Sequence, residues 1–153
     1  MAFRIETGVR PNLKSARRKR QRPLPAPRAR LKDETHLRIL RQLPCLVSGT
    51  APAGEAAHIR YASALHGKGI TGIGTKPDDK WAVPLCVWLH TMSSGAQHRD
   101  GEEWWWEERG IDPLFIAAQL YAVSVAMRDA KVPEHDVVRQ LTRMVIDFRR
   151  NVG

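Results

Sequence analysis

The C-terminal third of the sequence carries the clearest pattern of hydrophobic and polar positions, and the pattern predicts helices. The segment 133–150 opens on Pro133-Glu134 and repeats apolar residues along one helical face, namely Val137, Leu141, Met144, Val145 and Phe148. Before it, Asp112-Pro113 has the cap-then-proline order typical of a helix start, and the apolar stretch behind it runs to about residue 129. A shorter helix is expected over 101–109. The part from about 101 to 151 is therefore predicted to be helical.

Upstream of this part, the pattern predicts one helix and several short strands. Asp33 is in position to cap a helix that ends at Pro44, with leucines at helical spacing between them. A glycine-rich loop is expected over 61–80. The apolar stretches of strand length are 45–47, 56–60 and 81–86. Short strands among helices indicate an α+β fold, with a small hairpin and flanking helices.

The positive charge of the chain is concentrated at its start. Of the net charge of +9, residues 1–32 hold 11 Lys/Arg against one acid, whereas the remaining residues hold 14 Lys/Arg against 15 acids. Clustered like charges and prolines disfavour a packed fold, so residues 1–32 are predicted to be a disordered basic arm and 33–153 a folded domain. Such an arm binds nucleic acid by releasing counterions from phosphates, or serves as a solvated tail. Its densest run is Arg17, Arg18, Lys19 and Arg20.

Membrane and secretory classes do not fit the composition. No apolar run reaches the roughly 18–20 residues that span a bilayer, and the first residues lack the layout of a signal peptide. The two cysteines, Cys45 and Cys86, suit a compartment where thiols stay reduced. We therefore expect a cytoplasmic protein without a membrane partner. Two thiols also exclude a zinc site built from four cysteines.

Three histidines stand out by their positions. His58 lies in the stretch 56–60, and His90 and His98 follow the stretch 81–86. The acidic pair Asp78-Asp79 closes the loop between these two stretches. These features have the order of the HNH nuclease finger. That order is a strand with a histidine, a long loop with a polar anchor, a second strand and two further histidines.

The stretch 40–120 resembles a family of phage and bacterial HNH proteins, among them the RecA-dependent Ref-type nucleases. The resemblance implies a small ββα-metal finger over about 44–104. The matching residues are Leu43-Pro44-Cys45, Glu55-Ala56-Ala57-His58-Ile59-Arg60, Thr75-Lys76-Pro77-Asp78-Asp79-Lys80-Trp81, Val83-Pro84-Leu85-Cys86, Gln97-His98, Gly101-Glu102-Glu103-Trp104-Trp105 and Gly110-Ile111-Asp112-Pro113.

The same resemblance implies a metal-dependent endonuclease that hydrolyses DNA phosphodiester bonds. His58 would be the general base, its other ring nitrogen held by a backbone carbonyl, and an unperturbed pKa of about 6.5 suits histidine to this task. Asp79 occupies the position of the family's central asparagine, which clamps the loop, and Asp78 is the alternative. Arg60 and Lys76 are candidates for contacts with the phosphate backbone.

His90 and His98 are the candidate ligands of a divalent metal ion, for which Mg²⁺, Mn²⁺, Ni²⁺ and Zn²⁺ are the alternatives. On an unbroken helix the two histidines would be about 12 Å apart along the axis, too far to share an ion. The chain is therefore predicted to bend at residues 93–95, with His90 on a loop or strand end and a helix that begins near Ala96. Glu55 is a further ligand candidate.

Two other functions compete with the nuclease. The first is a DNA-binding module with a degenerate, inactive finger, because Ala57 stands where relatives place an acidic or histidine ligand. The second is an interaction protein whose helical C-terminal part recruits a partner. Elsewhere, two of the three tryptophans 104–106 are expected in the core, His66 at the surface or against a phosphate, and the acids of 102–108 on a solvated helix face.

Overall fold

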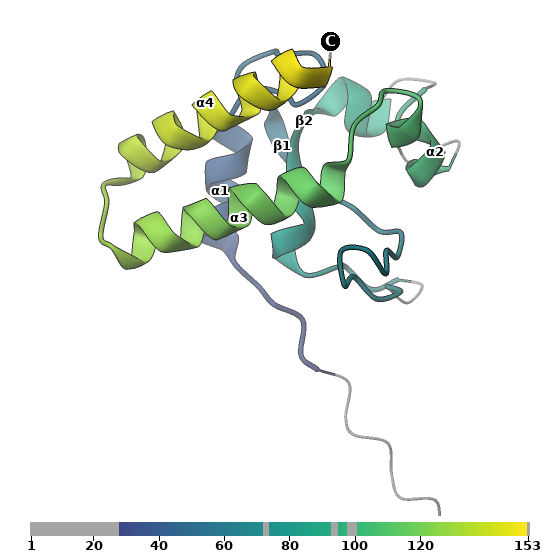
Figure 1. The fold of residues 1–153 in the computed structure, drawn as a ribbon, viewed down its shortest axis with the longest axis horizontal. Helices are drawn as coiled ribbons and strands as arrows, with labels where there is room; N and C mark the ends of the chain where they lie inside the picture. Colours follow the sequence, from purple (N-terminus) through teal and green to yellow (C-terminus); the bar gives the residue numbers. More distant parts are fainter. Residues whose placement is uncertain (1–27, 72–73, 93–94, 98–100, 153) are drawn as a thin grey trace, which may run out of the picture.

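The chain adopts a mixed α+β fold in the computed structural model, which describes residues 28–71, 74–92, 95–97 and 101–152 (Figure 1). No helix in these ranges is long and apolar enough to cross a membrane. In chain order the elements are α1 (Glu34–Gln42), β1 (Gly54–His58), η1 (Asp79–Trp81), β2 (Ala82–Cys86), η2 (Trp88–Met92), α2 (Glu102–Glu107), α3 (Pro113–Asp129) and α4 (Glu134–Val152).

A two-stranded antiparallel sheet lies at the centre of the fold. β1 pairs with β2 so that Gly54 lies opposite Cys86 and His58 opposite Ala82. β2 is buried over almost its whole length because both α1 and α3 pack against it. This register places His58 at the end of β1, beside the start of β2, where the chain returns from the loop that ends at η1.

The helix caps predicted from the sequence are confirmed. The side chain of Asp33 accepts a hydrogen bond from the backbone N–H of His36 at 2.9 Å, at the start of α1. Asp112 does the same for the N–H of Phe115 at the start of α3, also at 2.9 Å. A carboxylate in this position satisfies an N–H group that has no partner inside the helix. Both helices therefore begin where local chemistry dictates.

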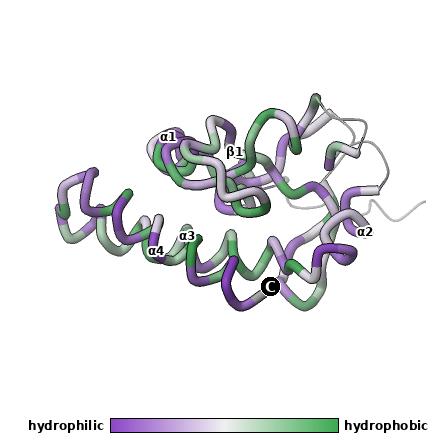
Figure 2. Tube along the Cα trace, turned by 90° about the horizontal axis from the view of Figure 1, so that it is seen from above, coloured by the Kyte–Doolittle hydropathy of each residue, from purple (hydrophilic) through white to green (hydrophobic). Residues whose placement is uncertain are grey.

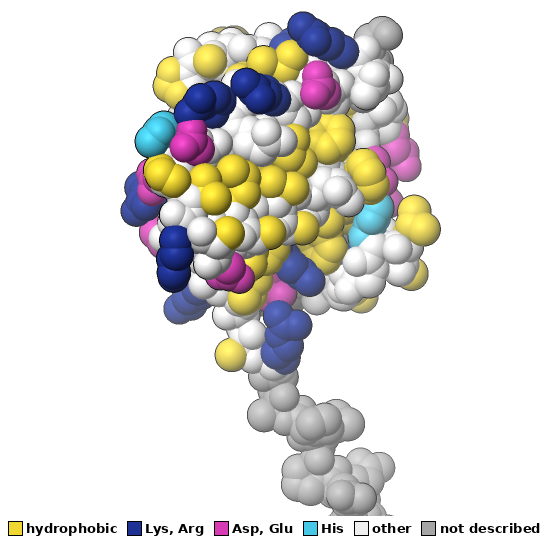
Figure 3. Space-filling model, turned by 60° about the vertical axis from the view of Figure 1, so that its left-hand side comes forward, with side chains coloured by type: hydrophobic (Ala, Val, Ile, Leu, Met, Phe, Trp, Pro, Cys, Tyr) yellow, Lys and Arg dark blue, Asp and Glu magenta, His cyan; other side chains and the backbone are white. Residues whose placement is uncertain are grey.

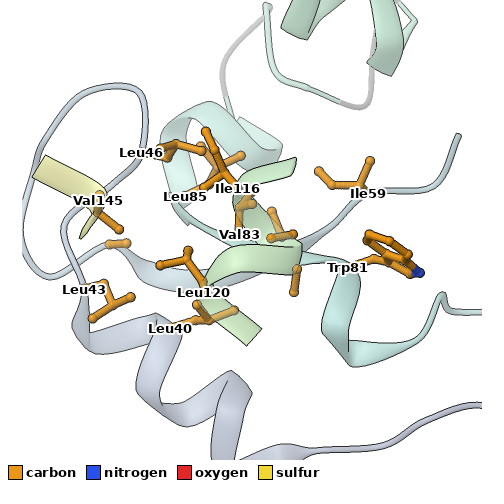
Figure 4. Packing of buried hydrophobic residues seen from close by; sticks show 14 of the residues in the cluster. Leu40, Leu43, Leu46, Ile59, Trp81, Val83, Leu85, Ile116, Leu120 and Val145 are labelled. Carbon is orange, nitrogen blue, oxygen red and sulfur yellow. The ribbon is translucent and has the colours of Figure 1, made fainter. Parts of the chain in front are cut away.

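Helices α3 and α4 form an antiparallel pair that covers the sheet and α1. Figure 2 shows the pair as one layer, with α1 and β1 in the other. The buried stripe of α4 consists of Val137, Leu141 and Val145, all fully buried, as its helical pattern predicts. Side chains of α1, β2, α3 and α4 meet in one core (Figure 4).

The surface is not uniformly polar. Helix α3 is apolar on most of its sides, and its Phe115 remains 48% exposed. Figure 3 shows hydrophobic side chains in a band that crosses one face of the molecule, with Lys, Arg and acidic side chains around it.

The prediction of a strand over 45–47 is wrong. The segment forms a turn in which Gly49 N–H donates to Cys45 O at 2.9 Å, and Gly49 has a positive φ of 77° that favours glycine. Leu46 N–H reaches β2 by a single hydrogen bond to Pro84 O at 2.9 Å. The chain has to reverse between α1 and β1 within a few residues, so tight turning takes precedence over strand propensity.

The prediction of a helix that begins near Ala96 is also wrong. His90 lies within η2, a five-residue π-helical turn, rather than on a loop, and α2 begins at Glu102. Residues 93 and 94 of the predicted bend lie outside the described residues, and Gln97 N–H, which follows them, donates back to Leu89 O of η2 at 3.0 Å. The described residues among 88–97 therefore do not form one straight helix.

The helix α2 buries two of its tryptophans, as predicted. Trp105 and Trp106 are 2% and 1% exposed, whereas Trp104 is 52% exposed. The prediction that all its acids lie on a solvated face is wrong for Glu102. One oxygen of Glu102 accepts hydrogen bonds from the N–H groups of Arg60 (2.8 Å) and Tyr61 (3.3 Å), and the other accepts from Gln97 (2.6 Å). Glu102 thus holds the segment that follows β1.

Candidate functional site

A basic pocket of about 540 Å³ brings five of the ten predicted site residues together. His58, Asp79 and His90 line it, and so do Arg60 and Lys76. Three further cations that the sequence did not single out also line it, namely Arg30, Lys32 and Arg41, and so does Glu34, which pairs with Arg41 at 2.7 Å. The pocket therefore places two imidazoles among five Lys/Arg and two acidic side chains, an excess of positive charge that suits an anionic ligand.

His58 is held by a buried carboxylate. Its Nε2 lies 2.8 Å from Oδ1 of Asp79, and the two side chains are 15% and 3% exposed. The other oxygen of Asp79 accepts the backbone N–H of Asp33 at 2.7 Å. Asp79, and not its neighbour Asp78, is thus the anchor of His58. The resemblance implies a backbone carbonyl as the partner of this histidine, whereas the structure provides a carboxylate.

Of the three cations that the sequence did not single out, Arg30 contacts the anchor of His58. Its guanidinium donates to Asp79 Oδ1, the same atom that binds His58, and its Nε donates to Pro77 O at 2.7 Å. Arg30 falls within a run of basic residues, so nothing in the sequence distinguishes it from its neighbours. Its role follows only from the packing of residues 28–31 against the loop before β2.

The folded part of the chain begins earlier than predicted. Leu31 N–H donates to Asp78 Oδ1 at 2.7 Å, and Arg28 reaches the other oxygen of Asp78 at 3.3 Å. Residues 28–32, assigned to the basic arm from the sequence, are therefore fixed against the loop before β2. The predicted nucleic-acid contacts Arg17, Arg18, Lys19 and Arg20 lie outside the described residues.

Burial and charge set the protonation of this pair. Burial lowers the pKa of His58 below its ordinary value, although the carboxylate of Asp79 acts in the opposite direction. Burial alone would raise the pKa of Asp79, but hydrogen bonds from Asp33 N–H, His58 and Arg30 outweigh it and lower that pKa. At neutral pH the imidazole is therefore neutral and the carboxylate ionised. Nε2–H then donates to Asp79, and Nδ1 keeps its lone pair.

His90 forms a second pair, with Glu55. His90 Nδ1, on η2, and Glu55 Oε2, on β1, are in hydrogen-bond contact. Their side chains are 18% and 35% exposed, so both are accessible. The second predicted ligand, His98, lies outside the described residues. Within the described ranges, no three His, Cys, Asp or Glu side chains come together as a metal-binding group.

The loop that follows β1 is fixed by two polar anchors. His66 Nε2 lies 2.8 Å from Asp112 Oδ2, so the ring is bound to the start of α3, and its side chain is only 16% exposed. The ammonium of Lys68 donates to Arg60 O at 3.0 Å and to Tyr61 O at 2.6 Å. These contacts give the loop a definite shape next to the basic pocket.

A scan against protein-family models and searches of curated proteins and of solved structures found no match to this chain. The case for a function therefore rests on the residues and geometry of the site.

Replacing Asp79 by asparagine is expected to lower the pKa of His58 further. The amide removes the charge that favours the imidazolium and leaves burial and the unpaired Arg30 to disfavour it. A histidine NMR titration of the variant and the parent protein measures the shift. Asp78→Asn is the matched control, since Asp78 binds Leu31 N–H and Arg28 instead, and should leave the titration of His58 unchanged. An unchanged or raised pKa in Asp79→Asn would show that the pair is not coupled.

Proposed function

We propose that the chain is a metal-dependent endonuclease of the HNH, or ββα-metal, type that hydrolyses phosphodiester bonds of DNA. The observation that carries the proposal is the His58–Asp79 pair, 2.8 Å between its atoms, inside a pocket lined by five Lys/Arg side chains. An anchored neutral imidazole is suited to accept a proton, and the cations around it are suited to bind a phosphate.

In this proposal the residues of the pocket have distinct tasks. Arg60 and Lys76 bind the phosphate of the strand to be cut. His58 accepts a proton from the attacking water at Nδ1, because Nε2 is occupied by Asp79. The ionised Asp79 then stabilises the imidazolium that forms, while Arg30 keeps the carboxylate in place. Water attack with proton transfer to His58 is general base catalysis.

The donors beside the pocket fit a divalent metal ion in part. His90 and Glu55 contribute an imidazole and a carboxylate that touch each other and are accessible, a mixed set that Mn²⁺, Ni²⁺, Zn²⁺ and, through its oxygens, Mg²⁺ accept. These two residues, together with His98, would hold the ion. A bound ion would neutralise charge on the phosphate and stabilise the departing 3′ oxygen.

The fold is compatible with the proposal. An antiparallel pair of strands carries His58 on the first strand, and a helical turn with His90 follows the second. This is the strand–strand–helix order of the finger that the resemblance implies. Both cysteines are free thiols, which agrees with an enzyme that acts in the cytoplasm.

A DNA-binding module with an inactive finger is the second candidate. Ala57 precedes the proposed base and is fully buried, so this position offers no ligand to an ion. The module would bind DNA through the same cations and would not need a metal. Metal binding and cutting therefore separate the two functions.

Metal titration is the test that distinguishes them. By calorimetry with Mn²⁺, the parent protein is expected to bind the ion, and His90→Ala and Glu55→Gln should each weaken binding by about 10-fold or more. The matched controls are His135→Ala and Glu107→Gln, which replace exposed residues away from the pocket and should bind Mn²⁺ like the parent protein. A parent protein that binds no metal and cuts no DNA would favour the inactive module.

A further inference from the structure

A second basic pocket adjoins the proposed active site. Its volume is about 670 Å³, and it shares Arg30, Lys76 and Pro77 with the first pocket. It is formed by residues 28–30, the loop 67–71 and residues 75–78 and 80–81. The shared residues line both pockets, so the two pockets lie side by side at Arg30 and Lys76.

Cations dominate the second pocket. Arg28 and Lys80 line it in addition to the shared Arg30 and Lys76, and Arg28 is 71% exposed. Its one acid, Asp78, is already bound by the N–H of Leu31 and by Arg28. Together the two pockets collect eight Lys/Arg side chains, three from residues 28–32 and five from later in the chain, against the three acids Glu34, Asp78 and Asp79. The lining of the two pockets thus carries an excess of positive charge.

The other lining residues indicate what kind of contact the second pocket makes. Trp81 is only 7% exposed and has Lys80 over its ring, so its face is not available for stacking on a base. The Lys68 ammonium is engaged with backbone carbonyls and serves to shape the loop. Ile70 is 89% exposed at the rim and offers an apolar contact to a sugar. Phosphate recognition without base recognition is the chemistry that remains.

We propose that the second pocket is a subsite for a neighbouring phosphate of the strand whose scissile phosphate occupies the first pocket. The inference rests on the proposed function for the identity of the first phosphate. The ligand is a polynucleotide strand laid across both pockets, and a mononucleotide fills only one of them. Each phosphate bound by a cation releases counterions, so affinity depends on strand length and on salt.

The test measures binding in EDTA, which prevents metal-dependent cutting and separates the subsite from activity. Fluorescein-labelled oligothymidylates of two, four and eight nucleotides are titrated with the full chain at several salt concentrations, and anisotropy reports binding. The test variant is Arg28→Gln/Lys80→Gln. The matched control, Arg143→Gln/Arg150→Gln, removes the same charge from exposed positions on α4.

The parent protein and the control variant are expected to gain at least 10-fold in affinity between the shortest and the longest oligonucleotide. The test variant should show little of this gain, and its slope of log affinity against log salt should be shallower by about 0.7 for each phosphate that it no longer binds. An unchanged gain and slope in the test variant, or an equal reduction in the control, would overturn the subsite. An intact length effect in a protein that cuts no DNA would support the subsite while rejecting the nuclease.

Discussion

Replacing His58 by alanine is expected to reduce metal-dependent DNA cutting by about 10²- to 10⁴-fold, the contribution typical of a general base. The imidazole is fixed by Asp79 and lies in the pocket with the cations that would bind phosphate. Its pKa is lowered by burial, so the base is in its active, neutral form at pH 7. The rate should therefore be flat near neutrality and fall only as the pH drops through this lowered pKa.

The control for this prediction is His135→Ala, which removes an exposed imidazole on α4 whose side chain is 75% accessible. It should cut plasmid DNA at the parent rate. Circular dichroism and Mn²⁺ titration of His58→Ala show whether the fold and the proposed metal ligands are intact. Cutting that persists in a folded His58→Ala variant would mean that another group activates the water.

Replacing His36 by phenylalanine is expected to remove much of the acid sensitivity of the fold. His36 is fully buried on α1 and packs edge-on against Tyr121 of α3, with ring centroids 5.0 Å apart. Burial lowers its pKa from 6.5 to about 4, against the attraction of Asp33. Protonation of His36 is therefore less favourable in the folded state than in the unfolded chain.

The pH window of this effect follows from the two pKa values. Above a pH of about 6.5, His36 is mostly neutral in both the folded and the unfolded protein. Its contribution to the free energy of unfolding is then constant. As the pH falls from about 6.5 to about 4, the unfolded state gains the proton first, and the free energy of unfolding decreases by about 3 kcal/mol. The lowered pKa values of Asp33 and Asp79 act below this window, since ordinary aspartates titrate near 3.8.

Urea unfolding at pH 7.0, 5.5 and 4.5 measures the prediction, and the variant should be as stable as the parent at pH 7 or more so. Neither ring nitrogen of His36 meets a hydrogen-bond partner within the described ranges, so an apolar ring of similar shape loses no hydrogen bond there. His36→Leu is a second variant, and His135→Phe is the exposed control. An equal pH dependence in the parent protein and both His36 variants would contradict the role of His36.

The sequence predicted those features that depend on neighbouring residues. Asp33 and Asp112 cap α1 and α3 through hydrogen bonds that span three residues, and the stripe of α4 follows a simple helical repeat. Local chemistry decides these features, so they are visible in the order of residues. The strand expected over 45–47 was wrong because a short apolar stretch has the same pattern in a strand and in a turn.

The polar contacts that shape the site depend on residues far apart in the chain. Arg30 meets Asp79 across 49 positions, and Glu102 reaches Arg60 across 42. A charged residue in such a contact has the same sequence context as one in solvent, so Arg30 was assigned to the basic arm and Glu102 to a solvated face. The choice between Asp78 and Asp79 was likewise settled only by the direction in which each side chain points.

The most direct test of the proposed nuclease is the incubation of supercoiled plasmid with the purified protein in Mg²⁺, Mn²⁺, Ni²⁺ or EDTA. Gel electrophoresis then separates supercoiled, nicked and linear forms. We expect conversion to nicked or linear DNA with at least one of the metals and none in EDTA. Plasmid that stays supercoiled with every metal, although the protein binds it in a salt-sensitive manner, would contradict the nuclease and leave a DNA-binding protein.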